Sequence, residues 1–154
     1  MRARARGPIG DELQFIVFRA GPREFAVGIL QVERILPYRE PAAGAGGPAV
    51  GLLEFGGRKL PVLDLRQRLG VPAPIGEDTR LMVLDLDGLK AALVVDQVTE
   101  VIRVDSVTIA PPPADDPVPF ASGEIARGDR RLLVMHPGRV LSPEERSALV
   151  PVPS

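Results

Sequence analysis

A glycine-centred hairpin pattern occurs twice in this chain of 154 residues. Its first copy has two apolar runs, residues 50–55 and 60–65, which are joined at Gly56-Gly57. Gly-Gly between β-prone runs is typical of a tight hairpin turn, because glycine adopts the positive φ that such turns require. The second copy spans residues 123–135. The aligned pairs are Gly51 with Gly123, Gly56 with Gly128, Arg58 with Arg130, Lys59 with Arg131, Leu60 with Leu132 and Val62 with Val134.

A second pair of segments repeats in the same order. Residues 26–36 align with residues 92–102, so that Gln31-Val32 falls on Gln97-Val98. Gly, Val and Leu are common residues, so one such match could arise by chance. Two separate segments that repeat in the same order make chance a poor explanation. We therefore predict that the chain duplicates one structural unit, with Leu60, Val62, Leu132 and Val134 buried at matching places.

Composition narrows the classes of function. The chain has 45% hydrophobic and 25% charged residues, which is typical of a globular protein. A net charge of −1 provides no basic field for nucleic acid, and no run of 18 apolar residues is present to insert into a membrane. The absence of cysteine excludes disulfides and thiolate chemistry, and the single histidine, His136, excludes a multi-histidine metal site. We expect neither a metal nor a cofactor.

The pattern of apolar runs and turn residues predicts about ten short strands and little helix. A connector rich in proline and glycine at residues 71–78 separates the repeats, residues 1–12 form a basic flexible tail, and residues 150–154 a C-terminal tail. Short helices are expected at residues 64–69 and after Ser142, which can cap a helix that Pro143 begins. Many short strands favour an all-β protein of two small barrels or open sheets. The expected strands are residues 13–18, 24–28, 29–36, 50–55, 60–65, 80–86, 89–95, 97–104 and both arms of the second hairpin.

One pair of residues suggests catalysis. Asp64 and His136 occupy equivalent places in the two hairpin copies, and a pseudo-two-fold axis could bring them together for general acid–base work in a small hydrolase. The alternative is that each residue caps the turn that follows its strand. The capping interpretation is favoured, because no serine nucleophile in a strained turn accompanies the pair.

The chain from residue 13 to residue 149 resembles the CheW family of bacterial chemotaxis coupling proteins. The motif Gly-x₅-Gly-x₃-Pro-Val-x-Asp-Leu, which begins at Gly51, and the later Val-Asp-x-Val, which contains Asp96, carry the resemblance most specifically. Further matching segments are residues 15–18, 25–33 and 131–134.

The resemblance implies a fold and a role. It implies two five-stranded SH3-like barrels related by pseudo-two-fold symmetry, with strands of each barrel drawn from both halves of the chain. It implies a cytoplasmic, non-catalytic adaptor, recruited to receptor arrays, that joins the cytoplasmic tip of methyl-accepting chemoreceptors to the regulatory domain of the CheA histidine kinase in a two-component pathway. In the family, receptor contact involves the positions that match Val32 and Gly51, and kinase contact uses the barrel ends. A charge placed at Gly51 is therefore expected to weaken receptor binding, and the fold is expected to survive it if Gly51 has ordinary backbone dihedrals.

The hairpin turn departs from the family pattern. Where the family usually carries Asn-Leu-Arg-Gly, this chain has Glu54-Phe55-Gly56-Gly57, so an arginine that supports assembly in the family is missing. We count Glu54 and Gly56 with Val32 and Gly51 as the predicted receptor-binding residues. The departure leaves open a divergent scaffold that binds only one of the two partners, and it also suits partners that have adapted to the change.

Overall fold

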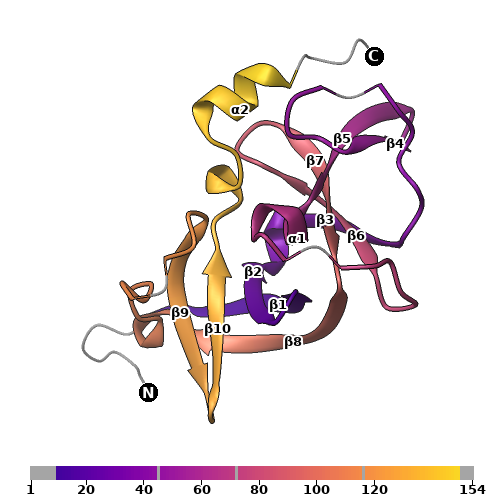
Figure 1. Ribbon diagram of the computed structural model, residues 1–154. Coiled ribbons are helices and arrows are strands. Elements are labelled where there is room, and N and C mark those ends of the chain that lie inside the picture. Colours follow the sequence, from indigo (N-terminus) through magenta and orange to yellow (C-terminus); the bar gives the residue numbers. More distant parts are fainter. Residues whose placement is uncertain (1–9, 45, 72, 116, 150–154) are drawn as a thin grey trace.

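The structure is a computed structural model, and it describes residues 10–149 except 45, 72 and 116. The predicted tails 1–9 and 150–154 lie outside the described residues, and the first strand begins inside the predicted tail, at Glu12. Ten strands alternate with short helices and turns (Figure 1). The strands are β1 (Glu12–Ala20), β2 (Arg23–Gly28), β3 (Val32–Pro37), β4 (Gly51–Phe55), β5 (Arg58–Asp64), β6 (Arg80–Asp85), β7 (Lys90–Val95), β8 (Gln97–Asp105), β9 (Ala121–Arg127) and β10 (Arg130–Met135). The helices are η1 (Ile29–Gln31), α1 (Leu65–Arg68), η2 (Ser106–Thr108), η3 (Pro137–Arg139) and α2 (Pro143–Ala148).

The strands form two five-stranded sheets that exchange strands between the repeats. The order is β8-β1-β2-β10-β9 in one sheet, called here the first barrel, and β3-β6-β7-β5-β4 in the other, called the second barrel. The first repeat therefore supplies β1 and β2 to the first barrel but β3, β4 and β5 to the second, and the second repeat does the reverse. This confirms the predicted all-β class of two five-stranded SH3-like barrels.

The two barrels match strand for strand. In both, a glycine of the first hairpin strand pairs with a valine of the second, Gly51 with Val62 and Gly123 with Val134. The turn glycines Gly56 and Gly128 have φ of +59° and +63°. The predicted duplication is thus present in the backbone register as well as in the sequence.

Three hydrophobic clusters hold the fold together. One fills the first barrel and includes Val17 and Leu132, and another fills the second barrel and includes Leu60 and Val62. A third and larger cluster lies between the barrels and takes the opposite faces of the same strands. Strands such as β6 and β7 are therefore buried on both faces, which explains why their sequences are continuously apolar rather than alternating. Of the four positions predicted to be buried, Val134 alone is only half-buried.

The crossover between the barrels corrects one expectation. Residues 29–36 were expected to be extended throughout, but Ile29–Gln31 form the 3₁₀ turn η1, and β3 starts only at Val32. The chain leaves the first barrel at Gly28, and the turn redirects it toward the second, with the Gln31 side chain accepting a hydrogen bond from the Gly28 N–H at 3.2 Å. The equivalent crossover from β7 to β8 needs only Asp96.

The C-terminal helix connects the barrels once more. Helix α2 follows β10 of the first barrel and begins with a capping box formed by Ser142 and Glu145, as the sequence predicted for its cap. Its Glu145 accepts a hydrogen bond from Arg68 of α1 at 2.5 Å, and Leu149 is buried in the central cluster. Figure 1 shows α2 beyond the end of β10, on the side of the second barrel's β4–β5 hairpin.

Candidate functional site

A buried arginine lies where the two repeats meet. Arg66, in α1, is only 2% exposed. Its guanidinium donates to both carboxylate oxygens of Asp64 at 2.9 Å, to Asp96 Oδ1 at 3.0 Å and to the Pro74 carbonyl oxygen at 3.3 Å. The hydrogen bonds that Arg66 donates to Asp64 are the main reason that the pKa of Arg66 is raised above its usual value, so the guanidinium is always charged. A buried cation is tolerated because two carboxylates and a carbonyl satisfy it.

Asp96 extends this network into the first barrel. Its Oδ2 accepts a hydrogen bond from the Gly21 N–H at 2.6 Å, and its own N–H donates to the Arg19 carbonyl oxygen at 2.9 Å. Both residues belong to the β1–β2 hairpin region, whereas Arg66 follows β5 of the second barrel. The first family-like motif ends at Asp64-Leu65, directly before Arg66, and the second contains Asp96, so the two motifs meet in space to hold the barrels together.

Asp64 and His136, the two residues of the catalytic hypothesis, both serve as helix N-caps. Asp64 Oδ1 accepts from the Arg66 N–H at 3.0 Å, and His136 Nδ1 accepts from the Gly138 N–H at 3.1 Å. Each residue is the N-cap of the short helix that follows, α1 and η3 respectively. Within the described part of the chain, no hydrogen bond or ion pair joins Asp64 to His136, and Asp64 is already engaged by Arg66. The geometry therefore matches the capping interpretation.

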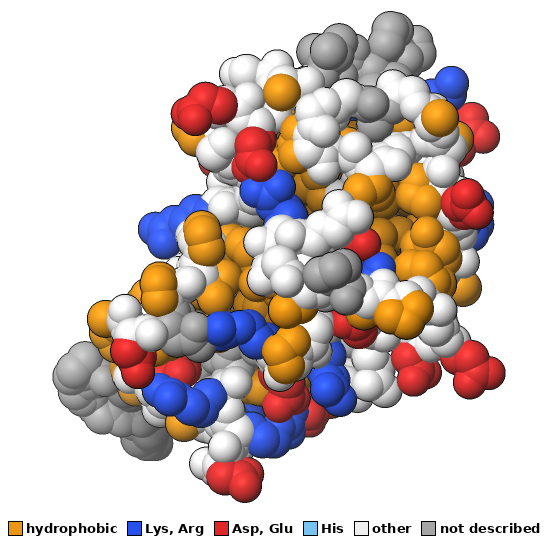
Figure 2. Space-filling view, in the orientation of Figure 1, with side chains coloured by type: hydrophobic (Ala, Val, Ile, Leu, Met, Phe, Trp, Pro, Cys, Tyr) orange, Lys and Arg blue, Asp and Glu red, His pale blue; other side chains and the backbone are white. Residues whose placement is uncertain are grey.

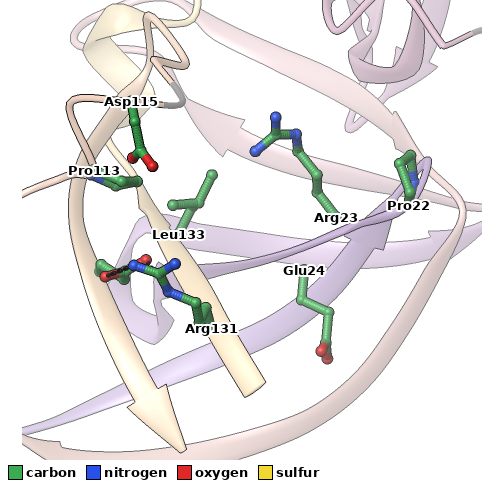
Figure 3. Close-up of a pocket in the computed structure, with 8 residues that line it drawn as sticks. Pro22, Arg23, Glu24, Pro113, Asp115, Arg131 and Leu133 are labelled. Atoms are coloured by element: carbon green, nitrogen blue, oxygen red, sulfur yellow. Dashed lines mark hydrogen bonds and ion pairs between the residues drawn. The ribbon is translucent and has the colours of Figure 1, made fainter. Parts of the chain in front are cut away.

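A small polar cavity opens between β2, β10 and the segment before β9. Its volume is about 260 Å³, and Pro22, Arg23, Glu24, Pro113, Asp115, Glu124, Arg131 and Leu133 line it. Arg131 pairs with Glu124 at 2.8 Å, and Figure 3 shows the Asp115 and Arg23 side chains on either side of Leu133. Typical ligand pockets are larger, about 300–1,000 Å³, and mostly apolar. The lining carries charges of both signs but neither a histidine nor a nucleophilic side chain such as serine. The cavity therefore suggests no catalytic reaction.

The predicted receptor-binding residues do not form one compact patch. Val32 is half-buried at the start of β3, where it packs against the central cluster, and Glu54 and Gly56 are exposed at the far end of β4. Gly51 is buried at the opposite end of that strand. Five residues of strand span roughly 17 Å, so Gly51 and Gly56 do not share a contact surface of side-chain dimensions.

Gly51 has a packing role that sequence reasoning missed. A methyl group at this position would lie 2.5 Å from Pro41 Cβ and 2.7 Å from the Ala42 carbonyl oxygen. Gly123 is approached in the same way but less closely, by Ile109 Cγ2 at 2.8 Å and the Ala110 carbonyl oxygen at 3.1 Å, and the backbone bridges Ala42–Leu52 and Ala110–Glu124 repeat the arrangement. The expectation that the fold survives a charged residue at Gly51 is therefore wrong, because the approach of a second backbone segment leaves no room for a side chain.

The edges of the second barrel close near the altered turn. The Arg34 guanidinium of β3 lies 5.7 Å from the centre of the Phe55 ring of β4, and Arg39 donates to the Glu54 carbonyl oxygen at 3.4 Å. These contacts place Glu54 and Gly56 beside β3, the strand that begins at Val32. Three of the four predicted residues are thus linked through the closure of one barrel, by an Arg34–Phe55 contact that no sequence pattern indicates.

Comparison with known proteins decides the family. The family model described as the CheW-like domain matches residues 14–145. The chain belongs to the CheW-like domain family. It is 31% identical over 143 residues to the chemotaxis protein CheW of Rhizobium meliloti, covering 88% of this chain and 91% of that one. It is 28% identical over 144 residues to CheW of Bacillus subtilis, covering 90% and 92%.

A solved structure of the family has the same fold. The crystal structure of the scaffolding protein TtCheW from Thermoanaerobacter tengcongensis matches with a TM-score of 0.72 and 25% identity, covering 81% of this chain and 89% of that chain. CheW-like proteins are scaffolds. A scaffold needs no catalytic residues, which agrees with the role of Asp64 and His136 as helix N-caps.

The surface carries exposed apolar side chains suited to contacts with other proteins. Leu30, between the barrels on η1, is 97% exposed, and Val101, on edge strand β8, is 53% exposed. On the face shown in Figure 2, hydrophobic side chains gather over the second barrel, whereas basic and acidic side chains are interspersed over the first. Among the described residues, the helices are too short to cross a membrane.

Proposed function

We propose that this protein is a non-catalytic chemotaxis adaptor that couples the cytoplasmic tips of chemoreceptors to the regulatory domain of a CheA-type histidine kinase. The observation that carries the proposal is the match to CheW proteins over nearly the whole chain, together with the fold of a CheW scaffold. The protein would act in the cytoplasm, at receptor arrays. Binding, rather than chemistry, is the activity to test.

The structure supports a receptor contact that includes Val32 and the neighbouring end of β4. A receptor tip is helical, and a helix usually docks its apolar side into a partly apolar groove. Val32 is accessible at the crossover between the barrels, and Glu54 and Gly56 lie beside the same strand. Gly51 is buried, and it allows Pro41 and Ala42 to pack closely against β4. Its contribution to a receptor contact is therefore indirect.

The test measures the two partners separately. The purified protein is mixed with a receptor-tip fragment in one assay and with the kinase regulatory domain in another, and binding is followed by calorimetry. Val32→Asp should weaken receptor binding about tenfold or more, because the new charge loses water on binding. Thr99→Asp, on the matching edge strand of the first barrel, is the control for an added surface charge. Absence of binding to both partners would refute the coupling function, and binding to one alone would establish a one-partner scaffold.

The altered turn distinguishes a weakened coupler from one whose partners have adapted. Gly56→Arg restores the family's arginine, and Glu54→Asn restores its neutral neighbour. We expect the double variant to bind its own partners no better than the parent, because an unpaired charge at an adapted interface must be desolvated. Binding several-fold tighter to both partners would contradict adaptation. Folding stability is measured in parallel, because Gly56 has φ of +59° and a side chain there costs roughly 1–2 kcal/mol.

A further inference from the structure

The internal duplication allows each charged residue of one barrel to be compared with its counterpart in the other. In the first barrel, Arg130 at the start of β10 donates to Glu24 of β2 at 2.7 Å and to Glu100 of β8 at 2.8 Å. The hydrogen bond from Arg130 lowers the pKa of Glu24 below its usual value, with burial opposing it. One arginine is thus enclosed by two carboxylates from neighbouring strands.

The counterparts in the second barrel are all basic. Arg130 corresponds to Arg58, because each opens the second strand of its hairpin directly after the turn. Glu24 corresponds to Lys90, since Ala26 and Ala92 occupy the same register beside β10 and β5. Glu100 corresponds to Arg34. Both glutamates that enclose the arginine in the first barrel are therefore replaced by cations in the second.

A shared irregularity fixes the third correspondence. In the first barrel the pairing of β8 with β1 passes from Val98 to Glu100 and leaves Thr99 unpaired. In the second barrel the pairing of β3 with β6 passes from Val32 to Arg34, so Glu33 has no backbone partner residue on β6. A β-bulge of this kind re-aims the side chains around it. Because both edge strands carry the same bulge, Arg34 and Glu100 leave their sheets from matching backbone positions.

The adjacent hairpin position shows the same loss of acidic partners. In the first barrel Arg131 pairs with Glu124 at 2.8 Å. Their counterparts in the second barrel are Lys59 and Leu52, which cannot form an ion pair. Lys59 and Arg58 are both exposed. Within the range that the structure describes, neither has a side-chain hydrogen bond or an ion pair. Arg34 lies over the Phe55 ring and, among the described residues, has no hydrogen bond or ion pair, whereas Lys90 pairs with Glu33 at 2.7 Å.

We propose that Arg34, Arg58, Lys59 and Lys90, here called the basic cluster, bind a carboxylate-rich segment of a partner protein, with Arg58 received between two acidic side chains as Arg130 is within the first barrel. The first barrel shows the geometry that such a contact takes, because the same backbone frame there holds glutamates around the same arginine. Arginine suits this role, since its guanidinium presents several donors in a fixed fork to carboxylates.

Protein carboxylates fit the cluster better than other anions. The internal counterpart is built from glutamate side chains rather than from backbone N–H groups or a phosphate-binding turn. Nucleic-acid binding usually combines an extended basic field with aromatic stacking, whereas this chain has a net charge of −1 and 4% aromatic residues. Glu33, which pairs with Lys90, and Glu54, which lies opposite Lys59 on the neighbouring strand, border the cluster and would repel a uniformly charged polyanion. The partner segment should therefore present a few acidic side chains at defined positions.

The first experiment measures binding of a fluorescein-labelled hexaglutamate peptide by fluorescence anisotropy at low ionic strength. The full-length protein should bind it, and binding should weaken as salt is added. Arg58→Ala should reduce the affinity by about fivefold or more, whereas Arg103→Ala, an equally exposed arginine on the first barrel, should leave it within about twofold. Equal losses in both variants would refute a specific site. A hexaglutamine peptide controls for backbone binding.

The second experiment transplants the first barrel's charges into the second. The triple variant Glu33→Thr, Arg34→Glu and Lys90→Glu copies Thr99, Glu100 and Glu24, and should enclose Arg58 within the protein. It should remain folded, with an unfolding midpoint no lower than that of the parent, and should lose peptide binding. A folded triple variant that still binds the peptide like the parent would overturn the proposal. If the triple variant unfolds, the peptide binding of Arg58→Ala alone decides between the outcomes. The Arg58 side chain is exposed, so its removal does not alter the hydrophobic core.

Other anions are outcomes of the same assay. A short oligothymidylate and vesicles containing anionic lipid are tested beside the peptide. Tighter binding to either, lost in Arg58→Ala, would assign the cluster to phosphate-bearing partners and refute the carboxylate assignment. The assay contains neither a receptor nor a kinase, so its result is independent of the proposed coupling function.

Discussion

Arg66 donates to Asp96 at 3.0 Å, and this contact joins the end of one repeat's hairpin to the crossover strand of the other. Asp96 also accepts the Gly21 N–H of the first barrel. The two barrels are therefore tied by a hydrogen-bonded ion pair as well as by the central hydrophobic cluster. Removing one partner of such a pair is costly, because the charge that remains is buried.

Substitution of Asp96 should destabilise the protein strongly. Asp96→Ala removes one counter-charge of Arg66 and the acceptor of Gly21, so we expect a loss of about 3 kcal/mol in the free energy of unfolding. Urea denaturation measures it, with Asp78→Ala, a nearby exposed carboxylate, as the control. A double-mutant cycle with Arg66→Met should show that the two changes are not additive. Additive effects would mean that the contact contributes nothing.

The two residues of the catalytic hypothesis should differ in their effect on stability. Asp64→Asn weakens the paired hydrogen bonds to buried Arg66 and should cost about 2–3 kcal/mol. His136→Ala removes only the cap of η3 and should cost about 1 kcal/mol. The difference arises because Asp64 also binds the buried Arg66, whereas His136 only caps a turn. Similar losses for both variants in thermal unfolding would argue against the Arg66 network as the source of the difference.

Matching positions on β10 should respond according to their burial. Leu132 is fully buried in the first barrel, so Leu132→Ala should cost about 2–5 kcal/mol by leaving a cavity. Val134 is half-buried, and Val134→Ala should cost clearly less. Chemical denaturation of both variants gives the comparison. A larger loss at Val134 than at Leu132 would contradict the burial described here.

Substitution of Gly51 and of Gly56 by alanine should destabilise the protein for different reasons. Gly51→Ala places a methyl group against Pro41 and the Ala42 carbonyl, and overpacking of this kind costs about 1–3 kcal/mol. Gly56→Ala meets no atom within 4 Å, and its cost comes from positive φ alone, roughly 1–2 kcal/mol. Hydrogen exchange separates the two. Gly51→Ala should loosen the Ala42–Leu52 bridge, and Gly56→Ala should not.

Acid should weaken the first barrel through Glu24. Because Arg130 lowers the pKa of this carboxyl from its usual 4.5, its contribution to stability is complete above that pH. The contribution is lost as the pH falls below 4.5 through the lowered pKa of the folded state. Glu24→Gln should therefore be less stable than the parent at neutral pH and converge with it in acid. A constant difference across the acid range, measured by urea denaturation, would contradict the linkage.

Much of the fold could be predicted from local sequence signals. Gly56-Gly57 located one hairpin, and the two repeated segments predicted that β4–β5 and β9–β10 are copies. Ser142 and Asp64 marked the starts of helices. These features are readable because turns and caps depend on a few neighbouring residues.

Contacts between distant segments could not be read in the same way. The exclusion of a side chain at Gly51 depends on Pro41 and Ala42 folding back over it. The partial burial of Val134 depends on its place within the first barrel, and the importance of Arg66 depends on Asp96, which lies 30 residues away. The motifs contain Gly51, Val134 and Asp96, but the spacing of residues along the chain does not state which of them touch.

The reciprocal exchange of strands between the repeats has a consequence for the history of the fold. A half-length ancestor would have lacked partners for its own β1 and β2, and two copies could have completed both barrels only as a symmetric homodimer with swapped strands. Fusion of the copies into one chain removes the requirement that the two barrels be identical. One barrel is then free to keep its arginine satisfied internally, as Arg130 is, while the other turns the equivalent Arg58 outward to the solvent.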